Sequence, residues 1–338
     1  MKAFTKIAAV GVAAAAGLGI TRQRAKLVGV AEELRHPALY IPMTISSDRS
    51  LRIARHLEGR FTPAVPSNAR AESIPATADR PAIPAFVYER SDRTRPGGAL
   101  LWIHGGGLIM GTTAMGHDIC GRIADELNVL VVSVDYRLAP EYPFPAGLDD
   151  CFAALQWMHD QAGVLGIDPT RVAVGGDSAG GGLAACVAQM ALDRDTPVCF
   201  QLLQYPMLDD RTALRTDDKS KNALGWSNSS NNFGWAAYLG HPVAQHSAHD
   251  DRDYAAASRR ADLSGLAPAW IGVGTIDLFH DEDVAYADRL QAAGIGCELH
   301  IVPGMYHGAD HIARKASSMK AFKDAMLAAL GAAIAVPR

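Results

Sequence analysis

The chain has 338 residues, of which 49% are hydrophobic and 20% charged, and 32 Lys and Arg face 36 Asp and Glu for a net charge of −4. This composition is typical of a globular protein and excludes a disordered, collagenous or coiled-coil chain. The slight acidic excess also argues against nucleic acid as a partner, because nucleic-acid-binding domains carry a basic footprint.

The first 26 residues allow two interpretations. An uncharged run over 7–20 follows a basic start, but it is shorter than the roughly 20 apolar residues that a membrane span needs. Its shape and the small residues at 14–16 fit a secretory signal, whereas the basic cluster at 22–26 directly after it opposes export. We therefore expect an Ala-rich packing helix and a cytoplasmic protein. A leader or membrane anchor is the less favoured alternative.

The pattern up to about residue 57 is helical, and five prolines between 63 and 84 then exclude one long helix. A strand follows at 85–88. From residue 99, short apolar runs without polar alternation predict strands buried on both faces, and the helical patterns between them predict an α/β fold with a parallel sheet. The further expected strands cover 100–104, 129–135, 172–176, 200–205, 269–274 and 297–302, and the expected helices cover 117–127, 148–159, 179–192, 281–293 and 317–333.

The stretch between residues 205 and 269 interrupts this alternation. A structureless insertion of that length is unusual in a compact domain, so we expect a small helical subdomain over one end of the sheet. The N-terminal helices have no other obvious partner and are expected to join it as a cap. The predicted division is cap residues 1–65, a core formed by 66–206 and 251–338, and a cap insertion at 207–250.

Residues 172–180 run from an expected strand directly into an expected helix and contain Gly-x-Ser-x-Gly centred on Ser178. A turn this tight requires residues without bulk beside the serine, and Gly176 and Gly180 meet that requirement. The turn also places Ser178 at a helix N-terminus, where amides and dipole favour developing negative charge. The segment predicts a serine nucleophile exposed above the sheet.

A second glycine-rich turn follows the strand expected at 100–104. Gly105, Gly106 and Gly107 let the backbone present amide groups without a Cβ in the way, as an oxyanion hole requires. We expect the amides of Gly106 and Gly107 to lie beside that of Ala179, with Gly105 making the turn. His104 is expected to brace this loop by hydrogen bonding.

A serine nucleophile needs a general base and a group that orients the base. Asp277 ends one expected strand and His307 follows the next, so both reach the sheet edge that carries Ser178. The chain order Ser178, Asp277, His307 is that of α/β-hydrolases. The rival groups are Asp281, Glu282, Asp283 and His311. Because these acids lie in the following helix, Asp281 and Glu282 are expected to cap or hold it.

The chain resembles the hormone-sensitive-lipase branch of the α/β-hydrolases, the bacterial family IV esterases. The resemblance rests on the HGGG at 104–107, the GDSAG at 176–180, the block DYRLAPE at 135–141 with its continuation to residue 150, and the segments around Asp277 and His307. It implies a mostly parallel eight-stranded sheet, a helical cap and no cofactor. It further implies hydrolysis of short- to medium-chain carboxylic esters through an acyl-enzyme on Ser178.

Leu108 departs from this family, whose members often carry an aromatic residue after HGGG. We expect Leu108, Tyr205, Trp226 and Phe233 to line the substrate pocket, although aromatic core packing explains the three aromatic residues equally well. No metal is expected, because the histidines at 241, 246 and 249 and the aspartates at 250, 251 and 253 match no standard spacing. A small-molecule ester is the expected binding partner. Whether the chain forms a homodimer is left open.

Four alternatives remain for the activity. The same three residues could serve a lactonase, an arylformamidase or amidase, or an acyltransferase. The remote fourth alternative is a non-catalytic ligand receptor, because a hydrolase fold alone does not establish hydrolysis. Membrane association through residues 1–26 is not favoured.

Overall fold

The computed structural model describes residues 27–40, 44–60, 63–243 and 252–334. The expected leader or packing helix in the first 26 residues lies outside this part of the chain, as do His246, His249, Asp250 and Asp251. Within the described ranges, no helix is both long and apolar enough to cross a membrane.

One eight-stranded sheet forms the centre of the molecule. Its strands are β1 (Ala69–Ile74), β2 (Ile83–Tyr88), β3 (Gly97–Ile103), β4 (Leu130–Val134), β5 (Ile167–Asp177), β6 (Phe200–Gln204), β7 (Ala269–Gly274) and β8 (Cys297–Val302). Their spatial order is β1-β2-β4-β3-β5-β6-β7-β8. β2 pairs antiparallel with β1 and β4, and all later neighbours are parallel. The mostly parallel eight-stranded sheet is confirmed.

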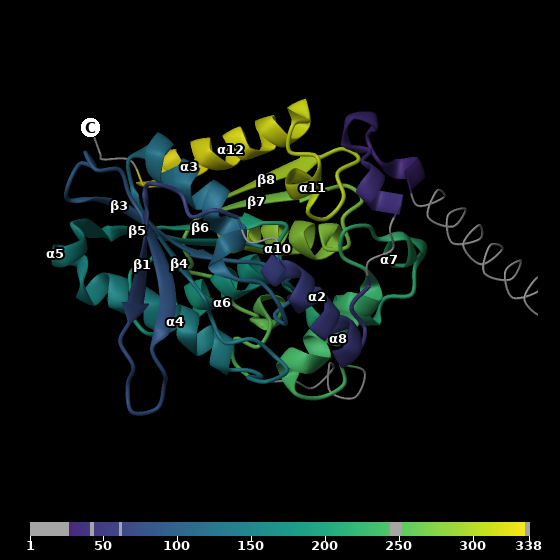
Figure 1. Cartoon of the computed structure of the whole chain (residues 1–338), viewed down its shortest axis with the longest axis horizontal. Helices are drawn as coiled ribbons and strands as arrows, with labels where there is room; N and C mark the ends of the chain where they lie inside the picture. Colours follow the sequence, from purple (N-terminus) through teal and green to yellow (C-terminus); the bar gives the residue numbers. More distant parts are fainter. Residues whose placement is uncertain (1–26, 41–43, 61–62, 244–251, 335–338) are drawn as a thin grey trace, which may run out of the picture.

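Helices cover both faces of this sheet (Figure 1). The longer ones are α2 (Asp48–Arg60), α3 (His117–Leu127), α4 (Ala146–Asp160), α6 (Ala179–Asp193), α8 (Asn228–Leu239), α10 (His280–Ala292) and α12 (Ser317–Ile334). α3 and α12 lie on one face, and α4, α6 and α10 lie on the other. The five core helices expected from sequence are all present. The shorter ones are α5 (Ala162–Leu165), α7 (Asp218–Asn222), α11 (Ala309–Ile312) and the 3-10 turns η1 (Leu27–Gly29), η2 (Glu32–Leu34), η3 (Pro37–Tyr40), η4 (Thr113–Gly116), η5 (Asp210–Leu214) and η6 (Ala257–Arg259).

The alternation of side chains along β3 shows why the apolar runs are strands. Leu101 and Ile103 belong to the hydrophobic cluster on the α4 and α6 side, whereas Leu100 and Trp102 belong to the cluster under α3 and α12. Successive side chains of a strand point to opposite faces, so a strand covered on both sides needs a continuous apolar run. The core is therefore two layers of apolar side chains with the sheet between them.

The strand β1 was not expected from sequence. It lies at the edge of the sheet, and most of its residues are partly or fully exposed, so it has no apolar run to reveal it. The helical expectation for the N-terminal region is met within its described part by α2 and by the short turns η1 to η3.

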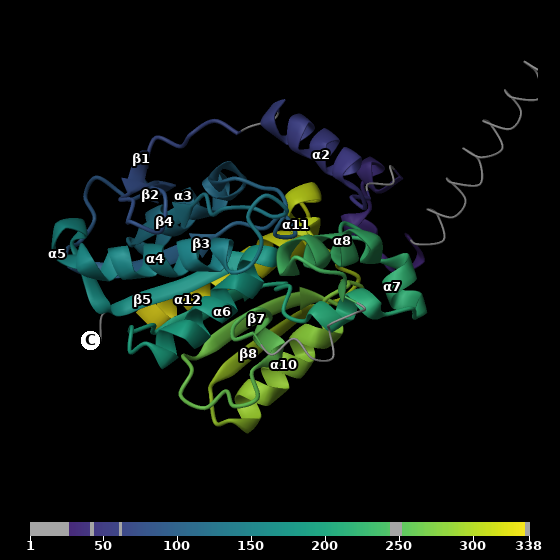
Figure 2. The ribbon, with the colours of Figure 1, turned by 90° about the horizontal axis from the view of Figure 1, so that it is seen from below.

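The insertion between β6 and β7 contains η5, α7 and α8, and it lies beside α2 (Figures 1 and 2). The Ile45 amide donates to Ser230 Oγ at 2.9 Å, so the chain just before α2 contacts α8 directly. Ser227 caps α8 by accepting from the Ser230 amide. The division into core and cap stays a prediction.

Candidate active site

Ser178 occupies the turn between β5 and α6 with a φ of 55°, a backbone conformation that residues other than glycine rarely adopt. A Cβ at Gly176 or Gly180 would overlap the carbonyl oxygen of Ile103, so the turn can pass β3 only with glycine at both positions. The Ser178 amide donates to the Gln204 carbonyl at 2.9 Å, which fixes the turn against the next strand. The expected sharp strand-to-helix turn is therefore present.

The three side chains expected to act together are joined by hydrogen bonds. His307 Nε2 lies 2.8 Å from Ser178 Oγ, and His307 Nδ1 lies 2.9 Å from Asp277 Oδ2. Asp277 is fully buried and also accepts from the Phe279 amide. The rings of Tyr205 and Phe279 contact the imidazole edge to face at centroid distances of 4.7 and 5.0 Å, so packing fixes its plane.

The rival acids contact other parts of the molecule. Asp281 forms ion pairs with Arg215 and Lys219 of the insertion. Burial raises the pKa of Asp281, but the hydrogen bonds and charges of Lys219, His280 and Arg215 outweigh it and hold this pKa well below the usual range. Glu282 accepts the backbone amides of Leu208 and Asp209. These two carboxylates attach the insertion to α10 and do not cap the helix, whose N-cap residue Phe279 makes no side-chain cap.

The glycine loop, residues 104–107, lies against the serine turn. The Gly105 amide donates to Asp177 Oδ1 at 3.0 Å, while the amides of Gly106 and Gly107 have no acceptor among the described residues. Gly106 has a φ of 115°, and a Cβ there would overlap the Met110 carbonyl, so only glycine fits this turn. Two amide donors of the glycine loop are thus without an acceptor within the part of the chain that the structure describes.

The side chain of His104 braces the glycine loop by a hydrogen bond and by ring stacking. Its Nδ1 lies 2.8 Å from the Gly105 carbonyl oxygen, and its ring stacks on Tyr136 at 4.4 Å. The Tyr136 hydroxyl in turn donates to the His104 carbonyl at 3.0 Å. Arg137 pairs with the buried Asp150 through two nitrogens, so part of the block at 135–150 anchors the backbone that carries Tyr136.

A network of charges beside the serine turn was not foreseen from sequence. His311 Nε2 lies 3.7 Å from Asp177 Oδ2 and 4.0 Å from the buried Asp310. Asp310 raises the pKa of His311 to about 9, with Asp177 adding to the effect and burial opposing it. Burial alone would raise the pKa of Asp310, but His311, Lys323 and the Tyr205 hydroxyl hold it below its usual range.

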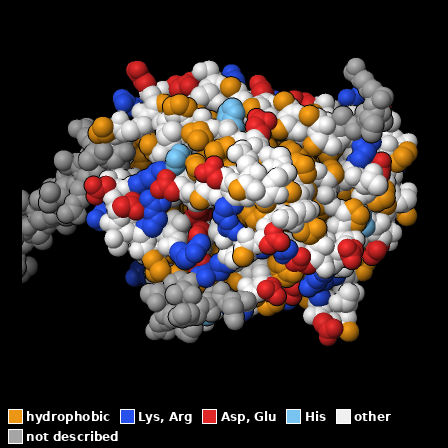
Figure 3. All heavy atoms as spheres, turned by 180° about the vertical axis from the view of Figure 1, so that it is seen from behind, with side chains coloured by type: hydrophobic (Ala, Val, Ile, Leu, Met, Phe, Trp, Pro, Cys, Tyr) orange, Lys and Arg blue, Asp and Glu red, His pale blue; other side chains and the backbone are white. Residues whose placement is uncertain are grey.

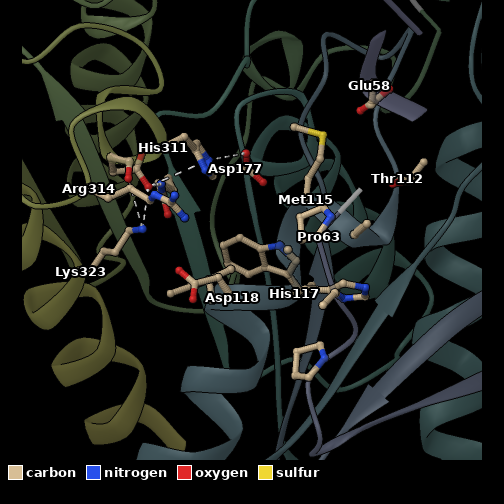
Figure 4. A pocket seen from close by; sticks show the side chains of 18 residues that line it. Glu58, Pro63, Thr112, Met115, His117, Asp118, Asp177, His311, Arg314 and Lys323 are labelled. Atoms are coloured by element: carbon tan, nitrogen blue, oxygen red, sulfur yellow. Dashed lines mark hydrogen bonds and ion pairs between the residues drawn. The ribbon is translucent and has the colours of Figure 1, made fainter. Parts of the chain in front are cut away.

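This network lines one end of a cavity of about 550 Å³ between α3, α11 and α12 (Figure 4). Asp177 and His311 face each other there, with Arg314 and Lys323 beside them and Asp118 across the cavity. Ser178 is not among the lining residues. His311, the rival base, therefore contacts the aspartate that precedes Ser178, whereas His307 contacts the serine hydroxyl.

The four residues expected to line the substrate pocket lie in different environments. Trp226 packs so closely on Gly107 that a Cβ at Gly107 would overlap its ring. Leu108 is buried in the core, and Phe233 is half-buried against it. Tyr205 is buried and donates its hydroxyl to Asp310. Trp226 thus packs on the glycine loop, and Leu108 follows that loop in the chain.

Comparison with known proteins points to one family. Residues 100–311 match the family model described as alpha/beta hydrolase fold. The chain is 40% identical over 210 residues to carboxylesterase NlhH of Mycobacterium tuberculosis, covering 62% of this chain and 65% of that protein. It is 34% identical over 235 residues to ethyl acetate hydrolase of Pseudomonas putida, covering 68% and 72% of the two chains. The alignment with NlhH thus spans just under two thirds of that relative.

The fold agrees with these matches. The solved structure of a bacterial heroin esterase superposes with a TM-score of 0.83 at 34% identity, covering 91% of this chain and 99% of that one. The chain belongs to the alpha/beta-hydrolase fold family. The resemblance to its hormone-sensitive-lipase branch, drawn from the motifs, is confirmed by these carboxylesterase-like relatives.

Proposed function

We propose that the protein is a serine carboxylester hydrolase with Ser178 as nucleophile, His307 as base and Asp277 as the orienting acid. The observation that carries this proposal is the hydrogen-bonded chain from Ser178 Oγ through both ring nitrogens of His307 to the buried Asp277. A hydroxyl, an imidazole and a carboxylate in this order are the parts that nucleophilic acyl transfer requires. The names of the relatives support an ester as substrate.

The geometry suggests the following steps. His307 Nε2 takes the Ser178 proton as Oγ attacks the ester carbonyl, and Asp277 stabilises the resulting imidazolium. The unused amides of Gly106 and Gly107, together with that of Ala179, donate to the oxyanion. The alcohol leaves with the proton from His307, and water then cleaves the acyl-enzyme by the same route.

The surroundings of Gly107 favour small acyl groups. Trp226 packs on one side of this residue, and a Cβ at Gly234 of α8 would lie 2.6 Å from its carbonyl oxygen. The insertion therefore packs directly on Gly107 of the glycine loop. We propose short- to medium-chain esters as substrates, with residues 207–250 acting with the N-terminal region as the cap.

The test measures p-nitrophenyl ester hydrolysis over acyl lengths from acetate to dodecanoate, together with mass spectrometry after reaction with a fluorophosphonate. We expect highest kcat/KM at short chains and one adduct on Ser178. Ser178→Ala should lose both activity and adduct while keeping the wild-type melting temperature. Turnover near wild type in folded Ser178→Ala would disprove the nucleophile, and faster cleavage of matched lactones or anilides would disprove the substrate class.

A further inference from the structure

Helix α2 lies on the outside of the molecule with one face packed and the other open to solvent (Figure 2). Leu51 is buried on the packed face. Arg55 Nε donates to the Ile109 carbonyl at 2.8 Å, and Glu58 accepts from the Gly111 amide at 3.2 Å. Both contacts reach the segment that follows the glycine loop, so they fix which side of α2 faces outward.

The open face of α2, defined as Arg49, Arg52, Ile53, His56, Leu57 and Arg60, combines basic and apolar side chains. These positions recur every three or four residues, which places them on one side of a helix. Ile53 and Leu57 are 53% and 47% exposed, although both are large aliphatic residues. Exposed apolar groups that recur along one helix face are typical of a surface that contacts another protein or a membrane.

The charge on the open face differs in sign from the charge of the chain. The whole protein carries −4, yet this face has three arginines and no carboxylate. Of the two acids of α2, Glu58 belongs to the packed face, and the exposed Asp48 lies at the first position of the helix beside Arg52, at the end of the open face. On the opposite side of the molecule, acidic and basic side chains are interspersed (Figure 3).

We propose that the open face of α2 docks on a membrane surface rich in anionic phospholipids. Lipid phosphates are the complementary partners of Arg49, Arg52 and Arg60, and the acyl boundary beneath them accepts Ile53 and Leu57. A helix lying in the plane of the surface needs no membrane-spanning length. In this orientation, residues 109–111, which contact the packed face of α2, lie on the side of the protein that is nearest the membrane. The proposal goes beyond ester hydrolysis and does not depend on it.

The test is sedimentation of the full chain with vesicles of phosphatidylcholine alone or with 30% phosphatidylglycerol, at low and at high salt. We expect binding to the anionic vesicles only, and weaker binding at high salt. Arg49→Gln/Arg60→Gln should weaken vesicle affinity about fivefold per arginine. Ile53→Ser/Leu57→Ser should weaken it about tenfold or more, because the apolar contact is lost. Both variants should hydrolyse soluble p-nitrophenyl acetate like wild type in the absence of vesicles.

Two matched control variants make the assignment specific. Lys315→Gln/Lys320→Gln removes two exposed charges from another surface, and Val164→Ser/Ile301→Ser removes two exposed aliphatic side chains. Both controls should bind vesicles like wild type.

Three results would overturn the proposal. The first is no binding of wild type to anionic vesicles. The second is equal binding by wild type and the α2 variants, which would place the contact elsewhere in the chain. The third is a concentration-dependent dimer in analytical ultracentrifugation that Ile53→Ser/Leu57→Ser abolishes, because the face would then bind a second copy.

Discussion

Asp177 and Gly105 are 72 residues apart in sequence, yet Asp177 Oδ1 accepts the Gly105 amide proton at an N···O distance of 3.0 Å. Asp177 directly precedes Ser178, and Gly105 directly precedes Gly106, where the glycine loop turns instead of at Gly105 as expected from sequence. One carboxylate therefore connects the nucleophile's turn to the amides proposed to bind the oxyanion. This contact adds to the packing of Gly176 and Gly180 on Ile103, and together they hold the serine turn against the glycine loop.

Replacing Asp177 should impair turnover more than substrate binding. We expect Asp177→Ala to lower kcat about tenfold or more with a smaller change in KM, because the loop amides lose their alignment with the developing oxyanion. Asp177→Asn keeps an acceptor oxygen for Gly105 and should recover much of kcat. The matched control is Asp118→Ala, an exposed aspartate of the same cavity. Equal kcat values for Asp177→Ala and Asp118→Ala would contradict this role.

His311 should stabilise the fold in a pH-dependent way. Asp310 and Asp177 raise its pKa to about 9, so the folded state holds this proton more tightly than the unfolded chain does. The stabilisation is complete below the unfolded value of about 6.5 and is lost as pH rises through about 9. We therefore expect the melting temperature of wild type to exceed that of His311→Gln at pH 6, with the gap closing by pH 10. The side chain is 42% exposed, so solvent screening keeps the gap small.

A constant gap between the two proteins from pH 6 to pH 10 would argue against this charge pairing. Lys320→Gln, which changes an exposed residue of α12, serves as the control and should show no such trend.

Asp283 is a buried carboxyl without a partner. Neither of its oxygens has a hydrogen-bond donor among the described residues, and burial, followed by the charges of Glu282 and Asp277, raises its pKa well above the usual range. The folded state thus loses stability as pH rises above the ordinary carboxyl value, by about 1.4 kcal/mol per pH unit until the folded pKa is reached. Asp283→Asn cannot ionise and escapes this loss.

The measurement is urea unfolding at pH 5 and pH 7. We expect the stability of Asp283→Asn relative to wild type to rise from pH 5 to pH 7, because only wild type must ionise a buried carboxyl. Asp288→Asn, at an exposed position of the same helix, should show no comparable gain. A difference between Asp283→Asn and wild type that does not change with pH would show that Asp283 ionises normally.

Trp226 should limit acyl length. Trp226→Ala removes the ring that packs on Gly107, so kcat/KM for hexanoate relative to acetate should rise about tenfold. Trp157→Ala, at a half-buried position of α4, controls for the loss of a tryptophan ring elsewhere in the molecule and should leave the ratio unchanged. An unchanged ratio in Trp226→Ala would mean that the acyl group lies elsewhere.

Prediction from sequence worked where the determining signal is local. Apolar runs in the sequence predict the buried strands. Asp277 and His307 follow two of these strands, so the rules of parallel sheets predict that both residues lie close to Ser178. The polar edge strand β1 has no such signal, because the strand beside it, not its own residues, determines its pairing.

The charges around His311 escaped prediction for a different reason. Asp177, Asp310 and Lys323 belong to three elements, β5, α11 and α12, and only the packing of α11 and α12 beside the serine turn brings them together. From sequence, His311 lies at the start of a helical stretch close after His307 and is therefore only a rival base. Its pairing with Asp177 depends on distances that no local pattern records.

The segment Gly225–Trp226 contacts two working parts of the molecule at once. A Cβ at Gly225 would overlap the His307 carbonyl, and the neighbouring Trp226 ring rests on Gly107. A substitution or a bulky ester that displaces this segment must therefore disturb both the backbone of His307 and the glycine loop. Acyl preference and turnover are consequently coupled in this chain. Evolution toward larger substrates would require changes next to both His307 and Gly107.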